Sequence, residues 1–116
     1  MNLAANIVVA IVALLHIWFL ILEMFLWTKP KGLKTFGMTK ELALQTAPLA
    51  ANQGLYNGFL AAGLLWGLLT HNFEFKLFFL GCVVVAGFYG AYSVNRRILF
   101  VQAVPAIIAT VLLLNS

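Results

Sequence analysis

Four long apolar runs, separated by short polar stretches, fill nearly the whole chain. They cover residues 3–27, 48–69, 77–94 and 98–114. A hydrocarbon core about 30 Å thick takes about 20 helical residues to cross, with a range of about 17 to 25. The pattern therefore predicts an all-α integral membrane protein, with residues 1–116 forming a single membrane domain built as a bundle of four transmembrane helices.

The composition agrees with this pattern. The chain is 64% hydrophobic and 9% charged over 116 residues, whereas about a quarter of the residues in a soluble domain are charged. The first six residues contain no lysine or arginine, and the apolar run that follows is longer than the core of a signal peptide. We therefore expect the first span to stay in the protein.

The basic residues divide unevenly between the two sides of the predicted bundle. Six of them lie in the loops after the first and third spans: Lys29, Lys31, Lys34, Lys40, Arg96 and Arg97. The opposite side holds Lys76. Loops rich in lysine and arginine stay in the cytoplasm, so both termini are expected outside. The charge is then a topology signal and an attraction to acidic lipid heads, not a nucleic-acid site.

Polar side chains open the second span, where hydrocarbon would make them costly unless they find partners. They are three carboxamides and a phenol: Asn52, Gln53, Tyr56 and Asn57. The other helices must therefore supply hydrogen-bond partners for the stretch 51–58.

The first span carries two matching polar residues. His16 and Glu23 are seven positions apart, so they share one face of a helix. Residues at the same depth in the bilayer face each other when two neighbouring spans are antiparallel. We therefore expect Glu23 to face Asn52 or Gln53, and His16 to face Asn57. These pairs would satisfy groups that lipid cannot.

The roles of these groups stay open at this point. Glu23 is either a hydrogen-bond hub, or an acid that reaches toward Arg96 or Arg97, or a proton or cation site. His16 is either a helix-contact residue or a ligand and proton relay. Gln102 in the fourth span is expected to join the cytoplasmic side of the same layer.

Glycines mark close helix contacts. Those that we expect at such contacts are Gly54, Gly58, Gly63, Gly67, Gly87 and Gly90. Small residues four apart let helices approach closely in a membrane. The second span carries two such ridges, which we expect to serve contact within the chain and contact between copies, so a homo-oligomer is predicted.

The loop 28–46 contains Pro30 and two glycines, which suit turns better than a continuous helix. Thr39 is a plausible N-cap for a short amphipathic helix at 40–44, lying in the interface before Pro48. A plain solvated loop is the alternative.

Several kinds of chemistry find no support. The sequence has no aspartate, no Ser-His-acid set and no phosphate-binding glycine loop. His16, Glu23 and the single cysteine, Cys82, do not have the spacing of metal ligands, and Cys82 is expected to be a buried, inert thiol. His71 is expected to be solvated. We therefore predict no catalytic residues and no metal, and the sequence identifies no cofactor.

Five segments carry a resemblance to a known family: LH at 15–16, LEM at 22–24, LW at 26–27, ANQGLYNGFLAAG at 51–63 and QAVPA at 102–106. Together they resemble the bacterial family called domain of unknown function 1304. The resemblance implies a small four-helix protein of the bacterial inner membrane, with both termini then in the periplasm. It implies no established reaction.

Two other families have a similar size and number of spans. The membrane-associated eicosanoid and glutathione enzymes are homotrimers with a site between subunits, but this chain lacks their arginine- and glutamate-rich signature. The small multidrug exporters carry a glutamate in the first span, whereas Glu23 lies toward the cytoplasmic end of it. The first comparison favours a trimer.

The expected function is that of a non-enzymatic inner-membrane protein. Its polar layer would bind a small ligand, lipid or ion and modulate membrane permeability or membrane potential. A glutathione-dependent membrane enzyme and a small proton-coupled drug exporter are the alternatives.

Overall fold

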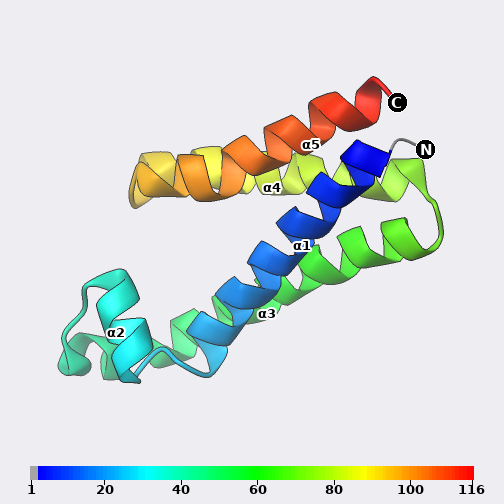
Figure 1. Ribbon diagram of the computed structural model, residues 1–116. Coiled ribbons are helices and arrows are strands. Elements are labelled where there is room, and N and C mark those ends of the chain that lie inside the picture. The colour runs from blue at the N-terminus through cyan, green and yellow to red at the C-terminus, as the bar shows by residue number, and fades with distance from the viewer. Residues whose placement is uncertain (1–2) are drawn as a thin grey trace. The chain divides into compact units, whose positions relative to one another are not determined.

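The computed structural model describes residues 3–116, which are helical almost throughout (Figure 1). The helices in chain order are α1 (Leu3–Met24), α2 (Pro30–Phe36), α3 (Lys40–Leu69), α4 (Phe73–Ser93), the π-helix η1 (Leu99–Ala103) and α5 (Val104–Leu114). The predicted all-α class is confirmed.

Two helices within residues 3–116 are long and apolar enough to cross a membrane, namely α1 and α4. Helices η1 and α5 together form a shorter apolar helix, Leu99–Leu114. Helix α3 has 30 residues and so has the length to cross, but its carboxamides lower its hydropathy.

Helix α3 begins eight residues before the predicted second span. Its N-cap is Thr39, as predicted, because Oγ1 of Thr39 accepts a hydrogen bond of 3.2 Å from the backbone N–H of Leu42. The helix continues through Pro48 without a break. A proline removes one hydrogen bond from a helix, and here the turns on either side keep the helical path. The separate short helix predicted at 40–44 is therefore the first part of α3.

The loop before α3 contains a short helix, whereas the sequence predicted turns there. Pro30 occupies the first turn of α2, where its missing N–H has no partner to lose. Gly37 ends the helix with φ 63°, and its N–H donates to the carbonyl of Leu33. The proline and the glycine thus act as the two caps of a short helix.

The chain folds into two compact units. The smaller unit is residues 15–59, which comprise the end of α1, α2 and most of α3. The larger unit comprises the start of α1 together with residues 60–116. The apolar core of the larger unit is formed by Ala5, Val9, Val12, Ala13, Leu64, Leu80, Val83, Ala106, Ala109 and Leu113.

Glycines bring the helices of the larger unit together. A Cβ placed on Gly67 would lie 2.8 Å from Cγ of Lys76, and one on Gly90 would lie 2.9 Å from Cγ2 of Ile98. The remaining two contacts of this kind join Gly63 to the ring of Phe79 and Gly87 to Ala103.

The smaller unit uses the other glycine ridge of α3. A Cβ on Gly54 would lie 2.6 Å from Cγ of Met24, and one on Gly58 would lie 2.8 Å from Cδ1 of Leu20. All six glycines named from the sequence therefore stand at helix contacts. Both ridges of α3 therefore make contacts within this chain, and the contact between copies that one of them was expected to serve stays a prediction.

Candidate functional site

The carboxylate of Glu23 and the carboxamide of Asn57 meet in the smaller unit. Nδ2 of Asn57 donates a hydrogen bond of 2.5 Å to Oε1 of Glu23. Asn57 is buried and Glu23 is half-buried. The close approach of α1 and α3 at Gly54 and Gly58 places the two side chains within reach. A buried amide thus holds an acid near the end of α1.

The partner of Glu23 differs from the predicted one. The sequence predicted Asn52 or Gln53 for Glu23, and it predicted Asn57 for His16. Asn57 instead donates to Glu23, so the partner predicted for Glu23 was wrong by about one helical turn. The register of α1 on α3 is set by the packing of Gly54 and Gly58, whereas the prediction compared depths in a bilayer.

The other polar residues of the stretch 51–58 turn to the surface. Asn52, Gln53 and Tyr56 are exposed. Nδ2 of Asn52 lies 3.4 Å from the hydroxyl of Tyr56, to which it donates, and the Tyr56 ring packs beside Phe59. The stretch therefore has two polar faces: Asn57 points inward to Glu23, and the remaining three point outward.

His16 lies two turns before Glu23 on α1 and is completely buried. Its ring meets the edge of Phe19 at a centroid distance of 5.1 Å. Gln102, which was expected to share a layer with Glu23, is half-buried in η1 and belongs to the larger unit.

The sequence predicted Lys76 at the end of a loop, 70–76, on the side opposite the other basic residues, whereas the structure places it in a helix. Helix α4 begins at Phe73, capped by Asn72, so Lys76 lies in its first turn. The side chain is fully buried, and Nζ donates a hydrogen bond of 3.0 Å to Oδ1 of Asn6. The signal that could have found this contact is Asn6 itself, a lone carboxamide at the start of an apolar run.

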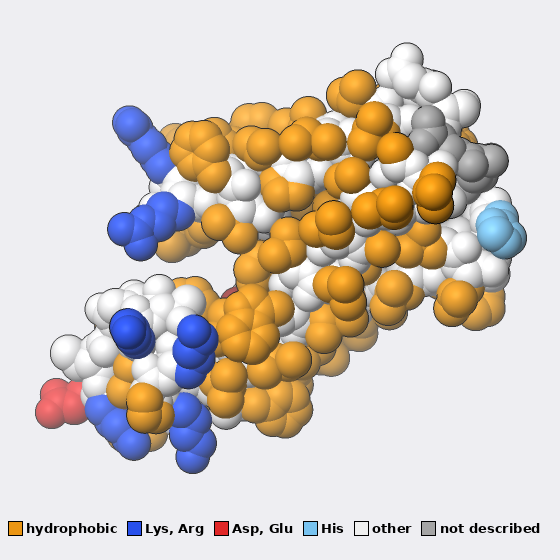
Figure 2. Space-filling view, viewed as in Figure 1, with side chains coloured by type: hydrophobic (Ala, Val, Ile, Leu, Met, Phe, Trp, Pro, Cys, Tyr) orange, Lys and Arg blue, Asp and Glu red, His pale blue; other side chains and the backbone are white. Residues whose placement is uncertain are grey.

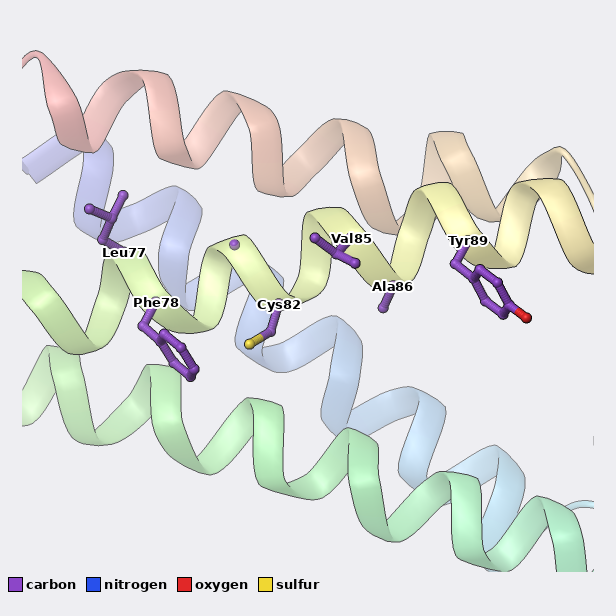
Figure 3. Close-up of a pocket in the computed structure, with 7 residues that line it drawn as sticks. Leu77, Phe78, Cys82, Val85, Ala86 and Tyr89 are labelled. Atoms are coloured by element: carbon purple, nitrogen blue, oxygen red, sulfur yellow. The ribbon is translucent and has the colours of Figure 1, made fainter.

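One face of α4 lines an open apolar groove in the larger unit (Figure 3). Its residues are Leu77, Phe78, Gly81, Cys82, Val85, Ala86 and Tyr89. The polar atoms of these side chains are a thiol and a phenol. Cys82 is half-buried there rather than enclosed. The groove thus offers an apolar surface and little to orient a polar ligand.

Metal ligands do not gather in the part of the chain that the structure describes: no group of three or more His, Cys, Asp or Glu side chains is placed to hold an ion. The carboxylate and carboxamide oxygens of Glu23 and Asn57 are of the kind that bind a proton or a hard cation.

Comparison with known proteins adds the family. The chain is 27% identical over 117 positions to the uncharacterized protein YpaA of Lactococcus lactis, and the match covers 96% of this chain and 97% of that relative. No solved structure matches the chain significantly. A profile of one family matches residues 10–114. This chain belongs to that family, which is described as protein of unknown function (DUF1304).

Proposed function

We propose that this chain is a multi-pass protein of the bacterial inner membrane, crossed by α1, α3, α4 and the η1–α5 segment, with both termini in the periplasm. The exposure of its apolar helices supports this. Only 28% of the most apolar window of α1 and 22% of that of α4 is buried. A helix from the core of a soluble protein would be covered by its own fold, so lipid is the natural cover for these surfaces.

The side-chain distribution supports the same placement. Figure 2 shows hydrophobic side chains over most of the visible surface, with the visible lysines and arginines gathered at one end of each unit. In the smaller unit these are lysines of α2 and its flanks, and in the larger unit they are Arg96 and Arg97, between α4 and η1. A cytoplasmic location for both groups follows from the positive-inside rule.

We propose that the Glu23–Asn57 pair binds a proton or a small cation, and that this binding modulates membrane permeability or membrane potential. The observation that carries the proposal is the hydrogen bond of 2.5 Å from Asn57 to Glu23. An acid between apolar helices is costly unless it is paired, protonated or bound to a cation. Carboxylate and amide oxygens are also the ligands that hard cations prefer.

The outward polar face supports association of copies. Asn52, Gln53 and Tyr56 are exposed, yet carboxamides and phenols that face hydrocarbon need partners. Carboxamides both donate and accept, so the same face of a second copy is a suitable partner. We propose a homotrimer, the number favoured by resemblance to the eicosanoid and glutathione membrane enzymes.

The ion site is tested in vesicles. The purified protein is reconstituted, a potential is imposed, and proton and potassium fluxes are measured with the wild type, Glu23→Gln and Glu41→Gln. Glutamine keeps an acceptor for Asn57 but removes the charge, so we expect flux to fall about tenfold or more. Glu41 is an exposed acid in the first turn of α3 and its variant should behave as wild type. Equal flux in all three proteins would remove the ion site.

The oligomer is tested separately by native mass spectrometry of the protein released gently from lipid. We expect the wild type to be a trimer, and we expect this trimer to dissociate when Asn52, Gln53 and Tyr56 are replaced by leucine or phenylalanine. A wild-type monomer would overturn the proposed assembly and leave the ion site standing.

A further inference from the structure

The segment that joins α1 to α3 carries a dense positive charge. Four lysines between positions 29 and 40 are all exposed: Lys29, Lys31, Lys34 and Lys40. The acid nearest to them in sequence is Glu41. This surface, here called the lysine surface, is visible as the blue side chains of the smaller unit in Figure 2.

The lysine surface is held in place rather than carried on a free loop. Gly32 is buried, and a Cβ there would meet the backbone carbonyl of Leu26 and come within 2.9 Å of that of Trp27. Helix α2 therefore packs directly on the turn that follows α1. Fixed lysines have already lost part of the backbone freedom that binding would otherwise cost.

An aromatic pair holds the same helix from its other end. The ring of Phe36 packs against Trp27 at a centroid distance of 4.8 Å with the ring planes tilted by 46°, and Nε1 of Trp27 donates a hydrogen bond of 3.0 Å to Oγ1 of Thr46. Gly32 and Phe36 thus hold α2 on the turn after α1, and Trp27 joins that turn to α3.

Apolar side chains within a few positions of the lysines in sequence are also exposed. Phe36 is 44% exposed, Phe25 65% and Leu42 47%. A partner that suits both kinds of side chain must offer negative charge next to an apolar layer. Acidic phospholipids have this structure, with phosphate groups immediately above acyl chains. Nucleic acid offers the charge without the apolar layer.

We propose that the lysine surface is a docking site for acidic phospholipid headgroups, with the four ammonium groups on the phosphates and Phe25 and Phe36 at the acyl boundary. The proposal rests on the membrane location proposed above and adds a lipid preference to it. It concerns α2 and its flanks, and is independent of the Glu23–Asn57 pair.

The test measures which lipid the whole protein retains. The purified chain is equilibrated with equal amounts of palmitoyloleoyl phosphatidylglycerol and phosphatidylcholine, and retained lipids are counted by native mass spectrometry. A lysine at a membrane surface contributes about fivefold to the binding of acidic lipid. We expect phosphatidylglycerol to be preferred, and the preference to fall about tenfold or more when all four lysines become glutamine.

Three variants make the result specific. Changing the four lysines to arginine should keep the preference. Changing Arg96 and Arg97 to glutamine removes two exposed charges that are not part of the lysine surface, so it should lower the preference less than the change of all four lysines. Gly32→Ala should weaken the preference although it removes no charge, because α2 can no longer pack on Leu26.

Each contrary outcome has a distinct meaning. Equal retention of both lipids by the wild type, or an equal loss in the Arg96 and Arg97 variant, would overturn the docking site. The docking site would also be overturned if an acidic protein co-purified in a way that depends on the lysines while neither lipid was preferred. Release of the protein from cell membranes by alkaline carbonate would instead overturn the membrane location itself. The ion site is a separate matter, so the ion flux through the variant with four glutamines should still depend on Glu23.

Discussion

Lys76 donates from Nζ to Oδ1 of Asn6 over 3.0 Å, joining the first turn of α4 to the start of α1 across 70 positions of sequence. Lys76 is fully buried, and its stem packs on Gly67 of α3. Three helices of the larger unit thus meet around one lysine side chain. A buried charge depends strongly on its partners, so this contact gives a sharp test of the fold.

Replacing Asn6 by leucine should destabilise the protein by about 2 to 3 kcal/mol, because it takes an acceptor away from a buried cation. The double variant Asn6→Leu with Lys76→Met should recover much of that loss, since it removes the cation too. Both are measured by unfolding in mixed detergent micelles. A double variant less stable than Asn6→Leu alone would show that the ammonium is not anchored by Asn6.

Two glycines of α4 should respond in opposite ways to the same change. A Cβ on Gly87 would lie 2.7 Å from the backbone nitrogen of Ala103, whereas Gly81 has open space around it. Gly87→Ala should therefore cost about 1 to 3 kcal/mol through overpacking. Gly81→Ala should be neutral or stabilise by up to about 1 kcal/mol, because alanine favours helix. Thermal unfolding of the two variants distinguishes them, and equal midpoints would contradict the packing of α4 on η1.

The N-cap of α3 should be measurable in the same way. Thr39→Ala removes the acceptor for the N–H of Leu42 and should cost about 1 kcal/mol. Thr39→Ser keeps a hydroxyl acceptor and serves as the control. If alanine and serine gave the same unfolding free energy, α3 would not begin at Lys40.

The indole of Trp27 and the hydroxyl of Thr46 should be energetically coupled. Their hydrogen bond of 3.0 Å joins the turn after α1 to the first half of α3. In a double-mutant cycle with Trp27→Phe and Thr46→Val, we expect a coupling of about 0.5 to 1.5 kcal/mol. Phenylalanine preserves an aromatic ring for Phe36, so the cycle isolates the hydrogen bond. Strictly additive losses would mean that the two side chains do not interact.

Local signals in the sequence predicted much of the fold. The apolar runs predicted the helical class, and Thr39 was identified as an N-cap because its hydroxyl satisfies an N–H of the first turn. The glycines were identified because only small residues allow the close helix approach that Gly54 and Gly87 make. These features depend on neighbours a few residues away, which a single sequence displays.

Features that depend on how helices slide against each other were not predicted. The partner of Glu23 was misplaced by about one turn, because the register of α1 on α3 is set by Gly54 and Gly58 against Met24 and Leu20. The burial of Lys76 was missed because its acceptor lies 70 positions away. Helix α2 was missed because Pro30 and Gly37 interrupt a helix in one position and cap it in another.

The π-helix η1 allows two residues that are five positions apart to contact the same helix, α4. Ile98 packs against Gly90 and Ala103 packs against Gly87, although Ile98 and Ala103 are five positions apart. In an α-helix, positions five apart point about 140° away from each other, and a π turn brings them to one side. Segment 98–103 therefore holds one residue more than a regular helix needs to make both contacts. Deletion of a single residue here would leave the downstream helix facing its core. This turn is therefore a place where the chain can lose a residue during evolution without a change of fold.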